Sequence, residues 1–243
     1  MQAPGADGTE AVADEAEVLH GPPLPALASA DLVYALYYGP LSRDAAVAEA
    51  HFSIRVDAGR YRLSTEGRAI GLVAMFYSGT LTQSSEGRLG AQGLQPEHYR
   101  EQRGRRPQRQ LRFDPDRRIM LGNGDPPEVP MPAGTQDRLS VYFQLGLLAR
   151  GRPALMQPGR RFHLPLASMR AVDRPTFTVV GAESQKTPLG ALDCLRVTVR
   201  NEADPGDPVF DIWLATGHRL WPARIRMTEA NGKVIDQILQ RYS

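Results

Sequence analysis

The sequence predicts a mainly β protein (α+β), with a curved antiparallel sheet or open half-barrel of many strands covered by one central helix. Apolar and polar residues alternate strictly over 48–56, a period typical of a strand with one buried face and one wet face. Similar segments recur at hairpin spacing, whereas a single segment has the spacing of an amphipathic helix. Strands this close in sequence favour hairpins over helical crossovers.

The chain is expected to consist of one domain after a leader. Residues 1–28 are rich in Ala, Gly, Pro and acidic residues and have no hydrophobic period, so they predict a disordered acidic leader. Residues 29–243 predict a single β half-barrel domain, large enough to fold without covalent cross-links. Cys194 is the only cysteine, which excludes an internal disulfide and a cysteine-based zinc site.

The strands can be placed by alternation and by turn residues. We expect loops at 88–107 and 122–134, where Gly and Pro are frequent. Asn231-Gly232 is the strongest hairpin signal. The expected strands are 31–38, 48–56, 60–65, 69–77, 108–114, 117–121, 162–166, 176–184, 195–199, 210–214, 223–227 and 234–241.

The helix is expected from Thr135 to about Arg150. Thr135 can cap its start, Asp137 would lie in the first turn where the helix dipole favours a carboxylate, and Gly151 can end it. The three- and four-residue spacing predicts one buried face, made of Leu139, Tyr142, Phe143 and Leu147.

Several short segments, taken in order, resemble the bacterial family known as domain of unknown function 3108. The likeness runs from about residue 31 to the C-terminus and rests on Tyr34-Ala-Leu-Tyr-Tyr, Gly59-Arg-Tyr61-Arg-Leu63, Ser78-Gly79, Gly93-Leu94-Gln-Pro96-Glu-His-Tyr99, Gly134-Thr-Gln-Asp137-Arg-Leu139-Ser140, Thr187-Pro188-Leu-Gly190, Trp213-Leu214 and Leu220-Trp-Pro222. The resemblance implies a secreted, periplasmic protein of Gram-negative bacteria without established activity. It also implies a fold similar to the half-barrels of periplasmic lipoprotein carriers, and supplies no catalytic residues.

Charge is distributed unevenly along the chain. Six of the 27 acidic residues and none of the 29 Lys and Arg residues precede Arg43. The densest basic segment lacks the interleaved aromatic residues that nucleic-acid binding would need, so a solvated face is the simpler interpretation, with lipid headgroups or anionic glycans as an intermediate one. No specific nucleic-acid partner is expected. The segment contains Arg100, Arg103, Arg105, Arg106, Arg109 and Arg112.

No catalytic, metal-binding or cofactor motif is present in the sequence, so we expect no catalytic residue, no metal and no cofactor. Asp137 is the best polar candidate at the mouth of a cavity, although a helix-start carboxylate explains it more simply. A glycosidase-like pair of Asp137 and Asp211 is conceivable, but an outward-facing Asp211 is favoured. Cys194 is expected to be a buried filler rather than a reactive thiol.

Three functions stay open. The first is a non-enzymatic periplasmic protein that binds or carries an apolar or lipid-like ligand. The second is a scaffold or interaction protein of envelope assembly, with an envelope protein as partner, and the third is a hydrolase of envelope polymers. We expect a monomer without a transmembrane segment, whose signal segment is absent from this chain. The expected ligand-binding residues are Tyr34, Phe52, Tyr61, Phe76, Asp137, Tyr142 and Phe143.

Overall fold

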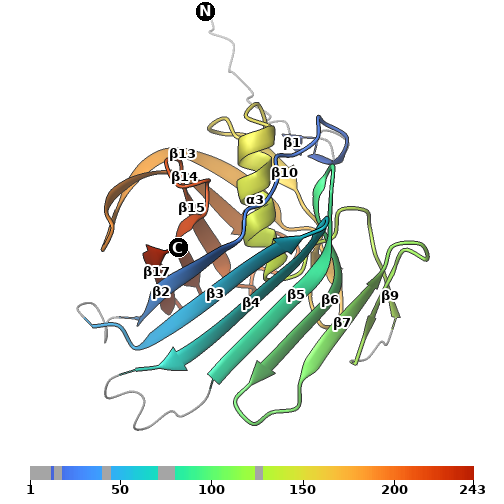
Figure 1. Ribbon diagram of the computed structural model, residues 1–243, viewed down its shortest axis with the longest axis horizontal. Coiled ribbons are helices and arrows are strands. Elements are labelled where there is room, and N and C mark those ends of the chain that lie inside the picture. The colour runs from blue at the N-terminus through green and yellow to red at the C-terminus, as the bar shows by residue number, and fades with distance from the viewer. Residues whose placement is uncertain (1–11, 14–17, 40–44, 71–79, 124–127) are drawn as a thin grey trace, which may run out of the picture.

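A computed structural model describes residues 12–13, 18–39, 45–70, 80–123 and 128–243. Within these residues, fifteen strands form one sheet that curves around the helix α3 (Ser140–Gly151) (Figure 1). The sheet is not closed into a barrel, because β1 and β9 lie at its two edges. The predicted mainly β fold, with a curved antiparallel sheet and a central helix, is confirmed.

Two antiparallel meanders make up the sheet. The first consists of β2 (Ala30–Tyr38), β3 (Ala48–Asp57), β4 (Arg60–Ala69), β5 (Thr80–Gly90), β6 (Gly93–Arg103), β7 (Arg109–Asp114), β8 (Ile119–Gly122) and β9 (Glu128–Pro130). The second consists of β13 (Thr176–Thr187), β14 (Gly190–Arg200), β15 (Val209–Ala215), β16 (Pro222–Thr228) and β17 (Val234–Tyr242). β10 (Arg161–His163) pairs with β13, and β1 (Val12–Ala13) pairs in parallel with β10 at the edge. β11 (Leu166–Ala167) and β12 (Val172–Asp173) pair separately.

The two meanders join where the last strand pairs with the first long one. β17 lies antiparallel to β2, with Leu239 opposite Tyr34. The helix α3 comes between the meanders in sequence and lies in the concavity that they form together (Figure 1). Among the described residues, no helix combines the length and apolarity needed to cross a bilayer.

Three sequence expectations need correction or fall outside the structure. Most of the expected loop at 88–107 belongs to the β5–β6 hairpin, so that prediction was wrong. The helix begins at Ser140 rather than Thr135, because the Thr135 hydroxyl donates to the carbonyl of Pro132 and caps nothing. The expected strand at 69–77 lies largely outside the described residues, since only residues 69 and 70 are described.

The boundary expected at residue 28 is also wrong. Val18, Leu24 and Leu27 are buried in the same apolar core as the helix. The Leu24 amide additionally donates to the carbonyl of Ala91 in the β5–β6 turn, at 2.7 Å. Residues 18–28 therefore belong to the folded domain, because burial of three apolar side chains outweighs the polar, Pro-rich composition between them.

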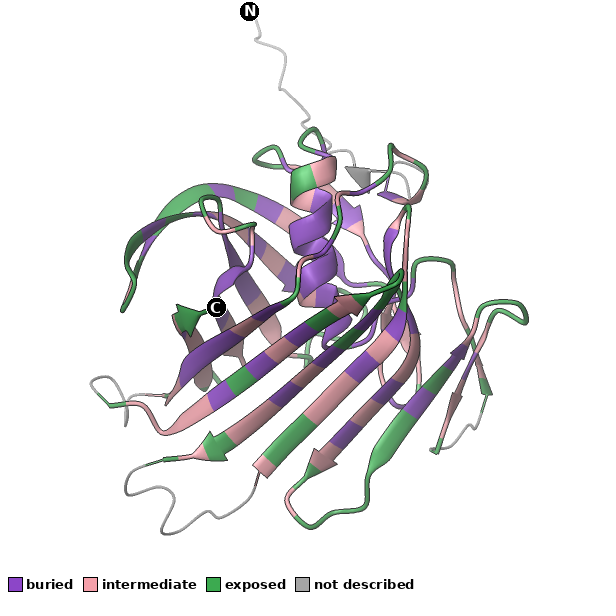
Figure 2. Ribbon diagram, in the orientation of Figure 1, coloured by how far each residue is buried: buried purple, intermediate pink, exposed green. Residues whose placement is uncertain are grey.

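The helix α3 is buried on nearly every side. Eight of its residues, Ser140, Val141, Phe143, Gln144, Leu145, Gly146, Leu147 and Leu148, are buried, and Figure 2 shows α3 as buried along most of its length. Gln144 fixes the helix to the β5–β6 turn: its Oε1 accepts from the Leu94 amide and its Nε2 donates to the Gln92 carbonyl, both at 2.9 Å. A helix that is apolar on all sides is typical of a core element.

Gly146 lets α3 approach the second meander. A Cβ at this position would lie 2.6 Å from the carbonyl oxygen of Leu220. We expect Gly146→Ala to lower the free energy of unfolding by about 1–2 kcal/mol, because overpacking outweighs the better helix propensity of alanine. Urea denaturation measures the change. Gly217→Ala is the control, since nothing lies within 4 Å of its added Cβ, and an equal effect of both would contradict the close approach.

Candidate functional site

The described residues of the expected ligand site lie in the packed core. The Tyr34 hydroxyl donates to the Pro222 carbonyl at 2.7 Å, and its ring meets that of Phe52 at 5.0 Å between centroids. Phe52 in turn contacts Phe143 of the helix edge to face, at 6.4 Å. Tyr142 is partly buried against the same cluster, whereas Phe76 lies outside the described residues. These aromatic side chains therefore pack against one another and fill the space between helix and sheet.

Asp137 lies just before the helix and is fully buried. Its Oδ1 accepts the amide hydrogens of Leu139 and Ser140, both at 2.8 Å, while its own amide donates to the Ser140 hydroxyl. Reciprocal bonds of this kind form a capping box. The residue therefore lies just before the helix rather than in its first turn, and it satisfies the helix amides that Thr135 was expected to serve.

The second carboxylate oxygen of Asp137 ends a buried hydrogen-bond chain. The Ser85 hydroxyl donates to Asp137 Oδ2 at 2.5 Å, and the Tyr61 hydroxyl lies 3.1 Å from the Ser85 oxygen. Burial raises the pKa of Asp137 to about 6, and the hydrogen bonds from Ser85, Ser140 and Leu139 oppose that rise. With no exposed surface, this carboxyl group is a structural helix start that no ligand contacts from solvent.

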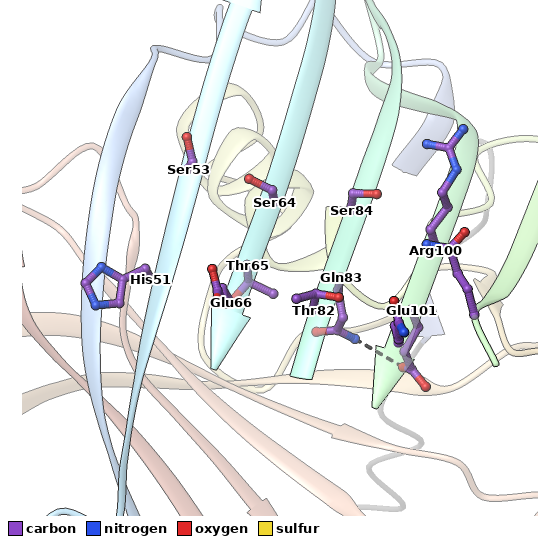
Figure 3. Close-up of a pocket in the computed structure, with 12 residues that line it drawn as sticks. His51, Ser53, Ser64, Thr65, Glu66, Thr82, Gln83, Ser84, Arg100 and Glu101 are labelled. Carbon is purple, nitrogen blue, oxygen red and sulfur yellow. Dashed lines mark hydrogen bonds between the residues drawn. The ribbon is translucent and has the colours of Figure 1, made fainter. Parts of the chain in front are cut away.

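The outer face of the first meander carries a line of small hydroxyl side chains. Ser53 and Ser64 lie between buried neighbours, and Ser84 precedes the buried Ser85, so all three point away from the core. The register places Ser53 opposite Ser64, Ser64 opposite Ser84, and Ser84 opposite Arg100. Figure 3 shows the three serines on neighbouring strands β3, β4 and β5. We call Ser53, Ser64 and Ser84 the serine row.

A second line of polar side chains, next to the serine row on the same face, contains His51, Glu66, Thr82 and Gln102. The serine row and this second line form the two sides of a hollow. A pocket of about 380 Å³ opens on this face (Figure 3). It is lined by His51, Ser53, Ser64, Thr65, Glu66, Thr82, Gln83, Ser84, Arg100, Glu101, Gln102 and Gln108.

Charges around this pocket are mostly paired. Glu66 binds Arg68 at 2.6 Å, and Arg100 lies 3.4 Å from Glu86. His51 lies 3.4 Å from Glu49. The pocket therefore offers hydroxyl, amide and paired charged groups, and its lining among the described residues includes no aliphatic or phenyl side chain. Such a lining suits a ligand that forms many hydrogen bonds.

Residues 33–238 match the sequence model of a protein family described as "Protein of unknown function (DUF3108)". The chain belongs to the DUF3108 family. No curated protein matches this chain.

Among solved structures, the DUF3108 domain is similar to a β-barrel-like protein of domain of unknown function DUF1849 from Brucella abortus. The two share 11% identity with a TM-score of 0.53, over 90% of this chain and 98% of that one. At this identity the likeness shows the fold alone.

Two further structures have TM-scores too low to support an argument. A "putative lipoprotein" from Parabacteroides distasonis shares 8% identity, with a TM-score of 0.35, over 92% of this chain and 99% of that one. A "putative exported protein" with a YmcC-like fold from Bacteroides fragilis shares 9% identity, with a TM-score of 0.33 and the same coverage.

The second meander of the DUF3108 domain has an outer cluster whose polar groups bind one another. Guanidinium groups of Arg196, Arg224 and Arg226 lie 5.1, 4.9 and 5.8 Å from the centre of the Trp213 ring, which is 2% exposed. Asp211 accepts from Arg196 and Thr198 on the same outer face. Asp137 and Asp211 thus lie on opposite sides of the sheet and form no carboxylate pair.

Cys194 of the DUF3108 domain is also inaccessible. It is 1% exposed beside Trp213, and burial raises the pKa of its thiol to about 11. A thiol in this state is a poor nucleophile, which agrees with the expected role as a small filler. Sequence reasoning missed the serine row instead, because β5, which carries Ser84, and the neighbouring β6 were not expected. The repeated Ser and Thr at alternate positions of 80–85 were the signal available.

Proposed function

We propose that this DUF3108 domain is a non-enzymatic protein of the bacterial cell envelope that acts as a scaffold or interaction domain through its outer surfaces. The observation that carries the proposal is the burial of α3 within the concavity of the sheet. A half-barrel that holds its own helix on all sides resembles a filled core more than a preformed ligand cavity. The family resemblance supports the envelope location, and a monomer stays a prediction.

The polar contacts of α3 further support a fixed plug. Gln144 satisfies the buried amide of Leu94 and the partly buried carbonyl of Gln92, and both would lose this partner if the helix moved away. The capping box of Asp137 and Ser140 fixes the N-terminus of the helix. A lid that opens for ligand would have to break both sets of bonds.

The other two functions receive less support from this geometry. A carrier of an apolar ligand would need Phe52 and Phe143 to separate, since these rings now contact each other. A hydrolase would need an accessible carboxylate, whereas Asp137 is sealed and Asp211 is engaged by Arg196 and Thr198.

Hydrogen exchange of the α3 amides tests the plug directly. If α3 is a core element, its amides exchange only through global unfolding, at rates matching those of central β3 and β17. Adding a fluorescent fatty acid should leave those exchange rates unchanged, and the emission of the fatty acid should show no saturable change when it is titrated with the protein. Faster exchange in α3 than in the sheet, together with saturable probe binding, would instead establish a mobile lid and a carrier.

A further inference from the structure

We infer that the outer face of the first meander binds an anionic glycan, a chain rich in hydroxyl groups that also carries carboxylate, phosphate or sulfate groups. The serine row and its pocket would hold the sugar hydroxyls, and the neighbouring β6–β7 hairpin would hold the anionic groups. This site deepens the proposed function, because it names a partner for one outer surface.

The hydroxyl groups of the serine row are available to a ligand. Ser53, Ser64 and Ser84 are partly exposed and form no side-chain hydrogen bond within the part of the chain that the structure describes. Neighbouring strands lie about 4.7–4.9 Å apart, so the row presents hydroxyls at a regular spacing of that order. Each hydroxyl both donates and accepts, as sugar hydroxyls do.

The surroundings of the row exclude other ligand classes. Aromatic rings for base stacking are missing from the pocket lining, apart from the imidazole of His51. An apolar ligand would desolvate the carboxylate of Glu66, the amides of Gln102 and Gln108, and the guanidinium of Arg100 without hydrogen-bonding them. Amide and hydroxyl groups at a pocket wall match a polyhydroxylated chain best.

The adjacent hairpin supplies the positive charge. We call Arg103, Arg105, Arg106, Arg109 and Arg112 the arginine hairpin; all five are exposed, and no acidic residue occurs over 102–113. Glu101 pairs with Arg103 at 3.1 Å and with Arg109 at 4.0 Å, but its side chain is only 1% exposed.

Three arginines of the hairpin keep an uncompensated charge. Within the described ranges, Arg105, Arg106 and Arg112 have no ion-pair partner. The pocket lining reaches Gln102 and Gln108, which flank the hairpin tip in sequence. One ligand chain can therefore contact the serine row and the arginine hairpin together, and its charge must be negative.

A set of matched polymers tests both parts of the inference. Polygalacturonate carries a carboxylate and free hydroxyls on each sugar, polyglutamate carries carboxylates without hydroxyls, and dextran carries hydroxyls without charge. At low salt we expect polygalacturonate to bind at least about tenfold more tightly than polyglutamate of equal charge, the factor that about 1.4 kcal/mol of hydrogen bonding gives. We expect no measurable binding of dextran.

Two pairs of variants separate hydroxyls from charge. Ser64→Val with Ser84→Val should weaken the binding of polygalacturonate about tenfold and leave that of polyglutamate unchanged. Threonine has the shape of valine but keeps the hydroxyl, so Ser64→Thr with Ser84→Thr should bind polygalacturonate as tightly as the parent. Arg105→Gln with Arg106→Gln should lower the slope of log K against log salt by about one per arginine removed.

Removing the same charge elsewhere is the control. Arg170→Gln with Arg200→Gln lowers the net charge equally and lies outside the first meander, so its salt slope should match that of the parent. Equal binding of polygalacturonate and polyglutamate, or preferential binding to phosphatidylglycerol vesicles through Arg105 and Arg106, would overturn the glycan assignment. Because none of these variants touches α3, failure here leaves the hydrogen-exchange test of the plug unaffected.

Discussion

Replacing Phe143 by alanine is expected to lower the free energy of unfolding by about 3–5 kcal/mol, the usual cost of truncating a fully buried phenylalanine. The side chain is 2% exposed and packs edge to face on Phe52, in the cluster that joins α3 to the sheet. The void would be lined by rigid helix and strand residues and could collapse only in part. Chemical denaturation of the purified domain, monitored by tryptophan fluorescence, gives the change directly.

Leu189→Ala is the matched control, because Leu189 is 38% exposed and lies in the β13–β14 turn. Its expected cost is within about 0.5 kcal/mol of zero, as for most surface substitutions. A loss below about 1 kcal/mol for Phe143→Ala would mean that the space around the ring is already loose. That outcome would favour a cavity between helix and sheet, and with it the carrier function.

Asp137→Asn is expected to remove a stability change that the parent protein shows between about pH 4 and pH 6. Burial raises the pKa of Asp137 from an ordinary 3.8 to about 6 in the folded domain. Over this interval the folded state retains a proton that the unfolded chain has released. This group therefore contributes most to stability below about pH 4, and its contribution falls by about 3 kcal/mol as the pH rises through 6.

The measurement compares free energies of unfolding of parent and variant at several pH values from 4 to 7.5. Asparagine keeps Oδ1 as the acceptor for the helix-start amides, so the fold should persist. Glu97, Glu101 and Asp236 titrate in both proteins; burial would raise their pKa values, but arginine partners lower them. Their contribution, which changes with pH in the opposite direction, is the same in both proteins and cancels when the two free energies of unfolding are subtracted. If that difference did not depend on pH, Asp137 would not have the raised pKa of a buried carboxyl group.

The sequence predicted the parts of the fold in which one rule acts alone. Strict alternation located β3 and β4 because one face is apolar and the other charged, and the spacing of Leu139, Phe143 and Leu147 located the helix. Its starting point was missed by five residues because Thr135 and Asp137 are both good caps. The nearby carbonyl of Pro132, which binds Thr135, and the tertiary neighbour Ser85, which binds Asp137, decide between them.

The β5–β6 hairpin escaped prediction because several of its inward positions are polar. Gln83, Ser85 and Glu101 point inward and form hydrogen bonds, so the hydrophobic alternation is absent. Gly87 looks like a loop residue, yet a Cβ there would lie 2.0 Å from the Gln95 carbonyl oxygen, at a bulge of the hairpin. A buried polar network and a bulge thus imitate a loop in sequence.

The candidate surface shows the same limit. The basic segment was visible as a run of arginines, but the serine row needs the register of three strands, one of them unexpected. Aromatic residues such as Tyr34 and Phe52 were read as ligand contacts because they would line a cavity in a carrier. In this chain the helix occupies that space, and the sequence cannot say how deeply a helix sits.

The pairing of β17 with β2 has a consequence for how the chain acquires its structure. Residues from opposite ends of the sequence meet at the seam of the sheet, so this contact closes a loop of about the whole domain. The chain must lose the entropy of that loop before the contact stabilises the fold. Such non-local topology predicts folding in the range of milliseconds to seconds or slower. Until Val234–Tyr242 has been synthesised, β2 keeps an unpaired edge, a site for aggregation. The native sheet can therefore be completed only after Val234–Tyr242 has been synthesised, whichever hairpins have formed before.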